Sequence, residues 1–197
     1  MIVDAHAHYV PPEFLDEVAS GRRKFPSVKL AFENGGYRFA FANNGAKRPV
    51  PPGMADTEKR KKWLAEHDID KQVVGGWLDV FGYDLPADEG ADWSRYLNEH
   101  FLKALKSHPF LVPLATVPMQ SGKHAAKVLE EALDAGFPGA MIGTQPKGAT
   151  GVLDDIGFTF EALLVCADAH KRAGSTNGQA LADAMRTTKI EKRAMVG

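Results

Sequence analysis

The chain has 197 residues, of which 44% are hydrophobic and 25% charged, and its 24 basic and 25 acidic side chains give a formal charge of −1. This balance is that of an ordinary globular domain, and it excludes collagen-like repeats, low-complexity disorder and a strongly basic nucleic-acid-binding protein. The single cysteine, Cys166, cannot form an internal disulfide, which favours a reducing compartment. No apolar run reaches the roughly 18 residues of a membrane span, and the first residues lack a signal-peptide pattern. We therefore expect a cytoplasmic protein without nucleic-acid or membrane partners.

The first fifty residues predict a strand, a helix and a hairpin. Residues 1–8 have a short strand pattern, and Pro12 and Glu13 suit the first turn of a helix that ends near Ala19. Residues 28–42 alternate apolar and polar side chains on both sides of an Asn-Gly-Gly turn, which predicts a β-hairpin. The glycine, asparagine and proline residues that follow predict a loop up to residue 53.

From residue 56 onward, predicted helices and strands alternate. The helices cover residues 57–66, 92–106 and 122–135, and the strands cover residues 71–78, 110–115 and 138–143. Together with the first strand, this alternation predicts a parallel sheet of four βα units. The last forty residues predict two helices, residues 158–172 and 179–187, with a glycine-containing break between them.

The strongest chemical signal is the His6-Ala7-His8 motif at the end of the first predicted strand. Because side chains two apart on a strand point to the same face, we expect Asp4, His6 and His8 to project together. Two neutral imidazoles on one face can bind one divalent ion such as zinc, and the carboxyl ends of strands carry the active site in parallel barrels. The motif therefore predicts a metal site, against the alternative of two polar residues at a strand end.

Several further motifs carry a resemblance to a known family. The opening Ile2-Val3-Asp4-Ala5-His6-Ala7-His8 is followed, in order, by segments at residues 69–74, 93–99, 108–118 and 136–155. These motifs resemble the amidohydrolase-related family that includes aminocarboxymuconate-semialdehyde decarboxylase and the resorcylate decarboxylases. The resemblance implies the N-terminal half of a (β/α)8 TIM barrel in which the hairpin is a small insertion. It also implies a divalent metal, usually zinc, with His6 and His8 as two of its ligands.

The resemblance further implies non-oxidative decarboxylation of a small aromatic or muconate-type carboxylic acid. Trp77, Thr144 and Gln145 lie on the expected rim of the site and are candidate substrate contacts. A metal-dependent hydrolase of an ester, lactone or amide bond would share the same motif, so it remains an alternative.

A non-catalytic fragment is the second alternative, because a catalytic zinc ion needs three protein ligands. No other histidine follows a predicted strand; the remaining five are His67, His100, His108, His124 and His170. For this reason we expect weak metal binding and no substantial catalysis by the chain.

The C-terminal residues 158–197 interrupt the βα pattern and resemble the C-terminal part of periplasmic branched-chain amino-acid-binding proteins. We therefore expect a partial barrel at residues 1–157 and a helical tail from a fused, truncated or frameshifted reading frame. A solute-binding module is a third alternative, which rests on the tail alone. Open strand edges in a half barrel predict self-association, and the basic run at residues 59–62 predicts a solvated helix face.

Overall fold

The computed structural model describes residues 1–33, 35–42, 44–143, 167–175 and 177–187. The chain divides into two compact units, residues 1–148 and 149–197. Among the described residues, no helix has both the length and the apolar character needed to cross a membrane.

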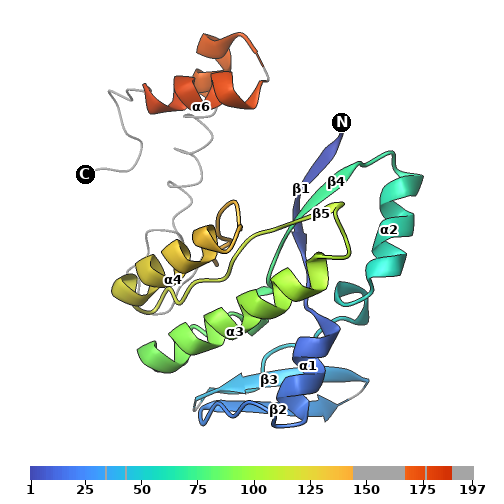
Figure 1. Ribbon diagram of the computed structural model, residues 1–197, viewed down its shortest axis with the longest axis vertical. Helices are drawn as coiled ribbons and strands as arrows, with labels where there is room; N and C mark the ends of the chain where they lie inside the picture. Colours follow the sequence, from blue (N-terminus) through green and yellow to red (C-terminus); the bar gives the residue numbers. More distant parts are fainter. Residues whose placement is uncertain (34, 43, 144–166, 176, 188–197) are drawn as a thin grey trace. The chain divides into compact units, whose positions relative to one another are not determined.

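A small parallel sheet forms the centre of the first unit (Figure 1). Its strands are β1 (Val3–His8), β4 (Lys71–Gly75) and β5 (Leu111–Pro113), in the order β1-β4-β5. A parallel bridge between Ala115 and Ala140 continues the sheet, so the fourth predicted strand is present only as a bridge. Within the described residues β1 is an edge strand, and the apolar side chains before and at its start are exposed. Self-association through this edge stays a prediction.

Three helices follow the strands and begin where local chemistry favours a helix start. In α2 (Thr57–Glu66), the Asp56 carboxylate accepts a hydrogen bond from the Lys59 amide at 2.8 Å, and α4 (Gly122–Asp134) is capped by Ser121. The helix α3 (Ala87–Leu105) starts one turn and more before the predicted start at residue 92. Two carboxylates in its first turn favour that earlier start, because they face the positive end of the helix dipole.

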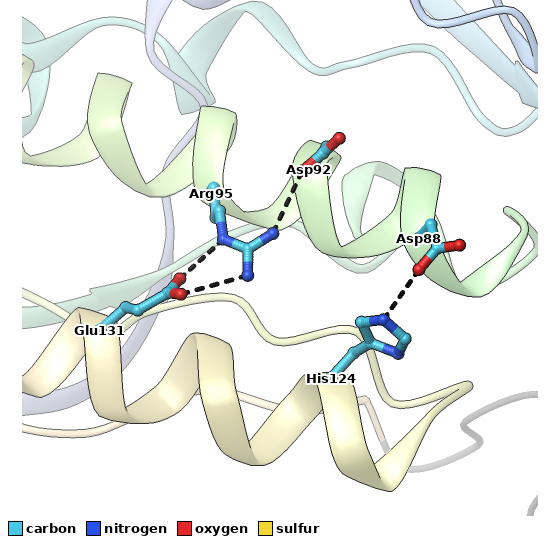
Figure 2. Close-up of polar contacts among 5 residues, drawn as sticks. All are labelled: Asp88, Asp92, Arg95, His124 and Glu131. Atoms are coloured by element: carbon cyan, nitrogen blue, oxygen red, sulfur yellow. Dashed lines mark hydrogen bonds and ion pairs between the residues drawn. The ribbon is translucent and has the colours of Figure 1, made fainter.

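Charged side chains join α3 and α4, which run side by side (Figures 1 and 2). Arg95 donates to the Glu131 carboxylate at 2.6 and 3.2 Å and to Asp92 at 3.1 Å. Its hydrogen bonds with Glu131 raise the pKa of Arg95 and lower that of Glu131. Nearer the start of α4, His124 Nε2 lies 2.9 Å from Asp88 Oδ1, so His124 takes part in helix packing.

The predicted hairpin is confirmed and is anchored by an aromatic cluster. Strands β2 (Val28–Glu33) and β3 (Gly36–Phe41) are antiparallel, and α1 (Pro12–Ala19) lies next to them. The buried Trp93 of α3 donates its indole N–H to the carbonyl of Val80 at 2.7 Å. Four phenylalanine rings surround it at centroid distances of 5.0–5.7 Å: Phe14, Phe25, Phe39 and Phe41. The hairpin is thereby fixed against α3, and the loop after it is held in place.

The second unit contains helical segments where the sequence predicts them. Residues 167–173 are helical, and α6 (Gly178–Arg186) begins at Asn177, whose side chain accepts hydrogen bonds from the amides of Gln179 and Ala180. The first part of the predicted helix 158–172 lies outside the described residues. The resemblance of this tail to a transport protein stays a prediction.

The hairpin offers a direct test of the aromatic cluster, because Phe39 is 1% exposed and Phe32 on the partner strand is 66% exposed. We expect Phe39→Ala to lower the free energy of unfolding by about 3–5 kcal/mol, since it removes a buried ring and leaves a cavity. Phe32→Ala should cost less than about 1 kcal/mol. Guanidinium denaturation of both variants measures the difference, and equal losses would contradict the cluster's role as anchor.

Candidate metal and substrate site

His6 and His8 meet at the carboxyl end of β1. Their rings lie edge to face with centroids 5.0 Å apart. With bonds of about 2 Å and a tetrahedral angle, two imidazoles on one zinc ion also place their ring centres about 5 Å apart. In chemistry and spacing, the two side chains therefore fit as two ligands of a divalent ion.

A hydrogen bond fixes the orientation of the His8 ring. Its Nδ1 lies 2.9 Å from the carbonyl oxygen of Gly76, which assigns the proton to Nδ1 and leaves Nε2 open to a metal. Burial lowers the pKa of His8, the neighbouring His6 lowers it further, and the bond to Gly76 opposes both effects. His8 is therefore neutral near pH 7, the state that binds a metal ion.

A β-bulge separates the histidines from Asp4. In the register with β4, Asp4 pairs with Gln72 and Ala7 with Val74, so three steps along β1 match two along β4. Gln72 and Val74 share a face, and Asp4 and Ala7 must share that face as well. His8 then points to the opposite face, and the prediction that Asp4 projects with the histidines is wrong. Instead, Asp4 Oδ2 accepts a hydrogen bond from Gln72 Nε2 at 2.7 Å.

Two glycines at the end of β4 leave room for side chains of other segments, Met141 at Gly75 and Phe81 at Gly76. A Cβ atom would lie 2.4 Å from a neighbouring side-chain atom at Gly75 and 2.8 Å at Gly76, distances that real Cβ contacts do not show. Both carbonyls contact β1 or the residue after it: Gly75 accepts from the Tyr9 amide at 2.9 Å, and Gly76 pairs with the His8 ring. The carbonyls at these positions, and not the absence of side chains, thus connect β4 to the end of β1.

A pocket of about 290 Å³ opens directly after β4. Two ion pairs lie in its wall: Lys47 Nζ is 2.7 Å from Asp84 Oδ2, and Arg48 Nε is 2.6 Å from Asp79 Oδ2. The Arg48 guanidinium also lies 5.2 Å above the centre of the Trp77 ring. The pocket is lined by Phe41, Lys47, Arg48, Leu78, Asp79, Phe81, Gly82, Tyr83, Asp84 and Gly143.

The cationic side chains reach the pocket because backbone hydrogen bonds hold the loop after the hairpin. The Lys47 amide donates to the carbonyl of Phe39 at 2.7 Å, and the Val50 amide donates to that of Tyr37 at 2.8 Å. These contacts place the cations beside the segment that follows β4. A Lys-Arg pair beside a proline is the local sequence signal for this role, and that signal is too common to predict a pocket.

A partly buried tyrosine completes the polar wall of the pocket. The Tyr83 hydroxyl accepts a hydrogen bond from the Gly143 amide at 3.1 Å, and burial raises the pKa of Tyr83 to about 12. The phenol therefore keeps its proton near neutral pH and can donate it in a hydrogen bond.

The predicted substrate contacts have different outcomes. Trp77 is 6% exposed and packs with the hydrophobic core, with Arg48 over its ring. Thr144 and Gln145 lie outside the described residues. Within the ranges that the structure describes, no group of three His, Cys, Asp or Glu side chains lies close enough to hold a metal ion. The role of His6 and His8 as metal ligands therefore stays a prediction.

The chain is similar in sequence to one kind of characterised enzyme over part of that enzyme's length. No protein-family model matches the chain. A curated relative, 2-amino-3-carboxymuconate-6-semialdehyde decarboxylase of Dictyostelium discoideum, is 25% identical over 165 residues. The match covers 78% of this chain and 42% of the relative, so the chain spans less than half the length of the curated protein that it matches.

Solved structures show the same fold. The 5-carboxyvanillate decarboxylase of Sphingomonas paucimobilis matches with a TM-score of 0.54 and 16% identity, over 82% of this chain and 48% of that one. The IDCase of Metarhizium anisopliae matches with a TM-score of 0.53 and 19% identity, over 75% and 43%. The 2,6-dihydroxybenzoate decarboxylase of Rhizobium matches with a TM-score of 0.51 and 15% identity, over 85% and 47%.

The comparisons confirm two predictions made from the sequence. The chain resembles decarboxylases of the amidohydrolase type, and its fold is part of a (β/α)8 barrel of that type. The solved structures support the fold alone, since their sequence identities with the chain are below 20%.

The His8 hydrogen bond leads to a titration test. In ¹H–¹⁵N NMR of the histidine rings, we expect His8 as the Nδ1-protonated tautomer, with a pKa below the usual 6.5. The second proton of the His8 imidazole therefore binds at a higher pH in the unfolded chain than in the folded chain. The unfolding free energy should therefore fall as pH is lowered from about 6.5 toward the folded pKa. A His8→Gln variant should lose that part of the pH dependence. A His8 ring that titrates at or above 6.5 would contradict the description.

Proposed function

We propose that the chain contributes to a metal-dependent decarboxylase that acts on a small aromatic or muconate-type carboxylic acid. The observation that carries this proposal is the His6–His8 pair at the carboxyl end of β1, on a partial barrel whose relatives include such decarboxylases. Residues 1–157 would form the barrel part, and residues 158–197 would be a separate helical tail.

In this proposal His6 and His8 hold the ion, with zinc as the expected metal. A bound divalent ion supplies Lewis acidity toward the oxygen atoms of a substrate. His8 is prepared for this role by its neutral ring and by the Gly76 carbonyl, which orients Nε2. The remaining ligands would come from outside the described residues.

The pocket after β4 is the proposed site for the acid. Its volume of about 290 Å³ is at the small end of ligand pockets, which suits a molecule with one ring. Arg48 could bind a carboxylate through two parallel hydrogen bonds in exchange for its pairing with Asp79. Tyr83 could donate its proton to a substrate oxygen, and Trp77, Thr144 and Gln145 remain proposed contacts.

Decarboxylation breaks the bond between the substrate carbon and its carboxylate group and releases carbon dioxide. The electron pair of that bond stays on the carbon, which then takes up a proton from water or from a nearby acid. A site for this reaction has to hold the substrate and screen its charge while the bond breaks. In this chain Arg48 and Lys47 would screen charge, and the loop after the hairpin would fix their distance from β4.

The test of the proposed activity is carbon dioxide release from 2,6-dihydroxybenzoate and from muconate-type acids with added zinc. The wild-type chain is compared with the His6→Ala, His8→Ala double variant. Turnover that the double variant abolishes would support the proposal. Turnover of esters, lactones or amides would instead favour a hydrolase, and no turnover would favour the non-catalytic alternative.

Substrate binding can be tested apart from turnover. We expect Arg48→Met to raise the dissociation constant of 2,6-dihydroxybenzoate by about 10- to 100-fold, because a charge-assisted hydrogen bond is lost. The matched control is Arg38→Met on β3, which removes an arginine that pairs with Glu33 and does not line the pocket. Isothermal titration calorimetry measures both variants. An equal effect of the two substitutions would rule out the pocket as the acid site.

A further inference from the structure

Arg60 lies in the basic run of residues 59–62, but it does not belong to a solvated face. Its neighbours Lys59, Lys61 and Lys62 are exposed, whereas Arg60 is partly buried and turned toward the sheet. Burial lowers the pKa of its guanidinium, and its Nε is buried without a hydrogen-bond partner among the described residues. Burying a cation is costly unless its contacts compensate for the lost water. The prediction of a solvated run is therefore wrong at this position.

The guanidinium of Arg60 makes two contacts that converge on the histidine strand. Its Nη2 donates to the backbone carbonyl of His8 at 2.7 Å, and its Nη1 donates to Gln72 Oε1 at 2.5 Å. Gln72 in turn donates to Asp4 Oδ2 at 2.7 Å, and Asp4 Oδ1 accepts from the backbone amide of His6 at 3.2 Å. One side chain from α2 is thus connected to the main chain of both histidines.

These contacts lie where β1 needs support. The bulge between Asp4 and Ala7 interrupts the ladder with β4. The His6 amide lies in that interval and donates to Asp4, and the His8 carbonyl, which follows the interval, accepts from Arg60. A lysine could not reproduce the arrangement, because only the planar guanidinium presents several donors in a fixed fork.

We propose that Arg60 is a positioning residue for the His6–His8 pair: through the His8 carbonyl and the Gln72–Asp4 connection, it holds the bulged end of β1 so that both rings face one ion. This inference rests on the proposed function for its purpose. The arrangement it describes exists in the metal-free chain and can be measured there.

The experiment compares Arg60→Met with the neighbouring Lys61→Met, which removes one exposed positive charge from the same helix. The first readout, in the metal-free protein, is the ring ¹⁵N shifts of His8 and the hydrogen exchange of the Tyr9 amide, which donates to Gly75. We expect Arg60→Met to mix the His8 tautomers and to accelerate exchange at Tyr9 by about tenfold or more. Lys61→Met should change neither.

The second readout is the affinity for cobalt(II), a spectroscopic substitute for zinc. We expect Arg60→Met and Arg60→Lys to weaken binding by about 10- to 100-fold relative to Lys61→Met, as for other residues that orient metal ligands. Gln72→Leu should have a smaller effect, because it breaks only the connection to His6. If Arg60→Met does not fold, Arg60→Lys and Gln72→Leu provide the same comparison.

The two proposals fail in different ways. In one outcome the wild-type chain does not bind cobalt(II), but Arg60→Met still changes the His8 tautomer and the Tyr9 exchange rate. That outcome would overturn the metal site and support the positioning role. In the other outcome the wild-type chain binds cobalt(II), both Arg60→Met and Lys61→Met alter this binding equally, and the His8 tautomer and Tyr9 exchange do not differ between them. That outcome would overturn the positioning role and leave the proposed function standing.

Discussion

The candidate site depends on two backbone carbonyls at the end of β4 that contact the end of β1. Gly75 accepts from the Tyr9 amide and Gly76 pairs with the His8 ring, while Met141 and Phe81 occupy the space in which Cβ atoms of these two residues would lie. The same segment continues into the pocket wall, so the position of β4 sets both the orientation of one imidazole and the place of the proposed acid site. A side chain at Gly76 would displace Phe81, which lines the pocket, and would thereby disturb the proposed acid site.

The remaining parts of the first unit support this contact from outside. The aromatic cluster around Trp93 fixes the hairpin against α3, and the hairpin fixes the loop that carries Lys47 and Arg48. The ion pairs of Arg95 hold α4 against α3, beside the strands that α3 connects. Each support acts through burial or through paired charges, and neither requires a bound ligand.

Local signals were sufficient for most of the fold. Asp56 marks a helix start, the Asn-Gly-Gly turn marks the hairpin, and the βα alternation predicts the parallel sheet. The site was predicted less completely, because its geometry depends on residues distant in sequence. Nothing local reveals the bulge that separates Asp4 from the histidines or the inward turn of Arg60, since both arise from pairing with Gln72 and β4.

Asp4 and Arg60 contact the two histidines through backbone atoms and not through the imidazole rings. Arg60 contacts the carbonyl of His8, and Asp4 contacts the amide of His6, so neither contact requires a histidine at those positions. If the proposed metal site holds, replacement of one imidazole by a carboxylate or a thiolate would change which ions it prefers and would leave both backbone contacts in place. In such an arrangement, the contacts that place the two residues do not depend on which side chains they carry. Metal preference could therefore change between related proteins that keep the same strand.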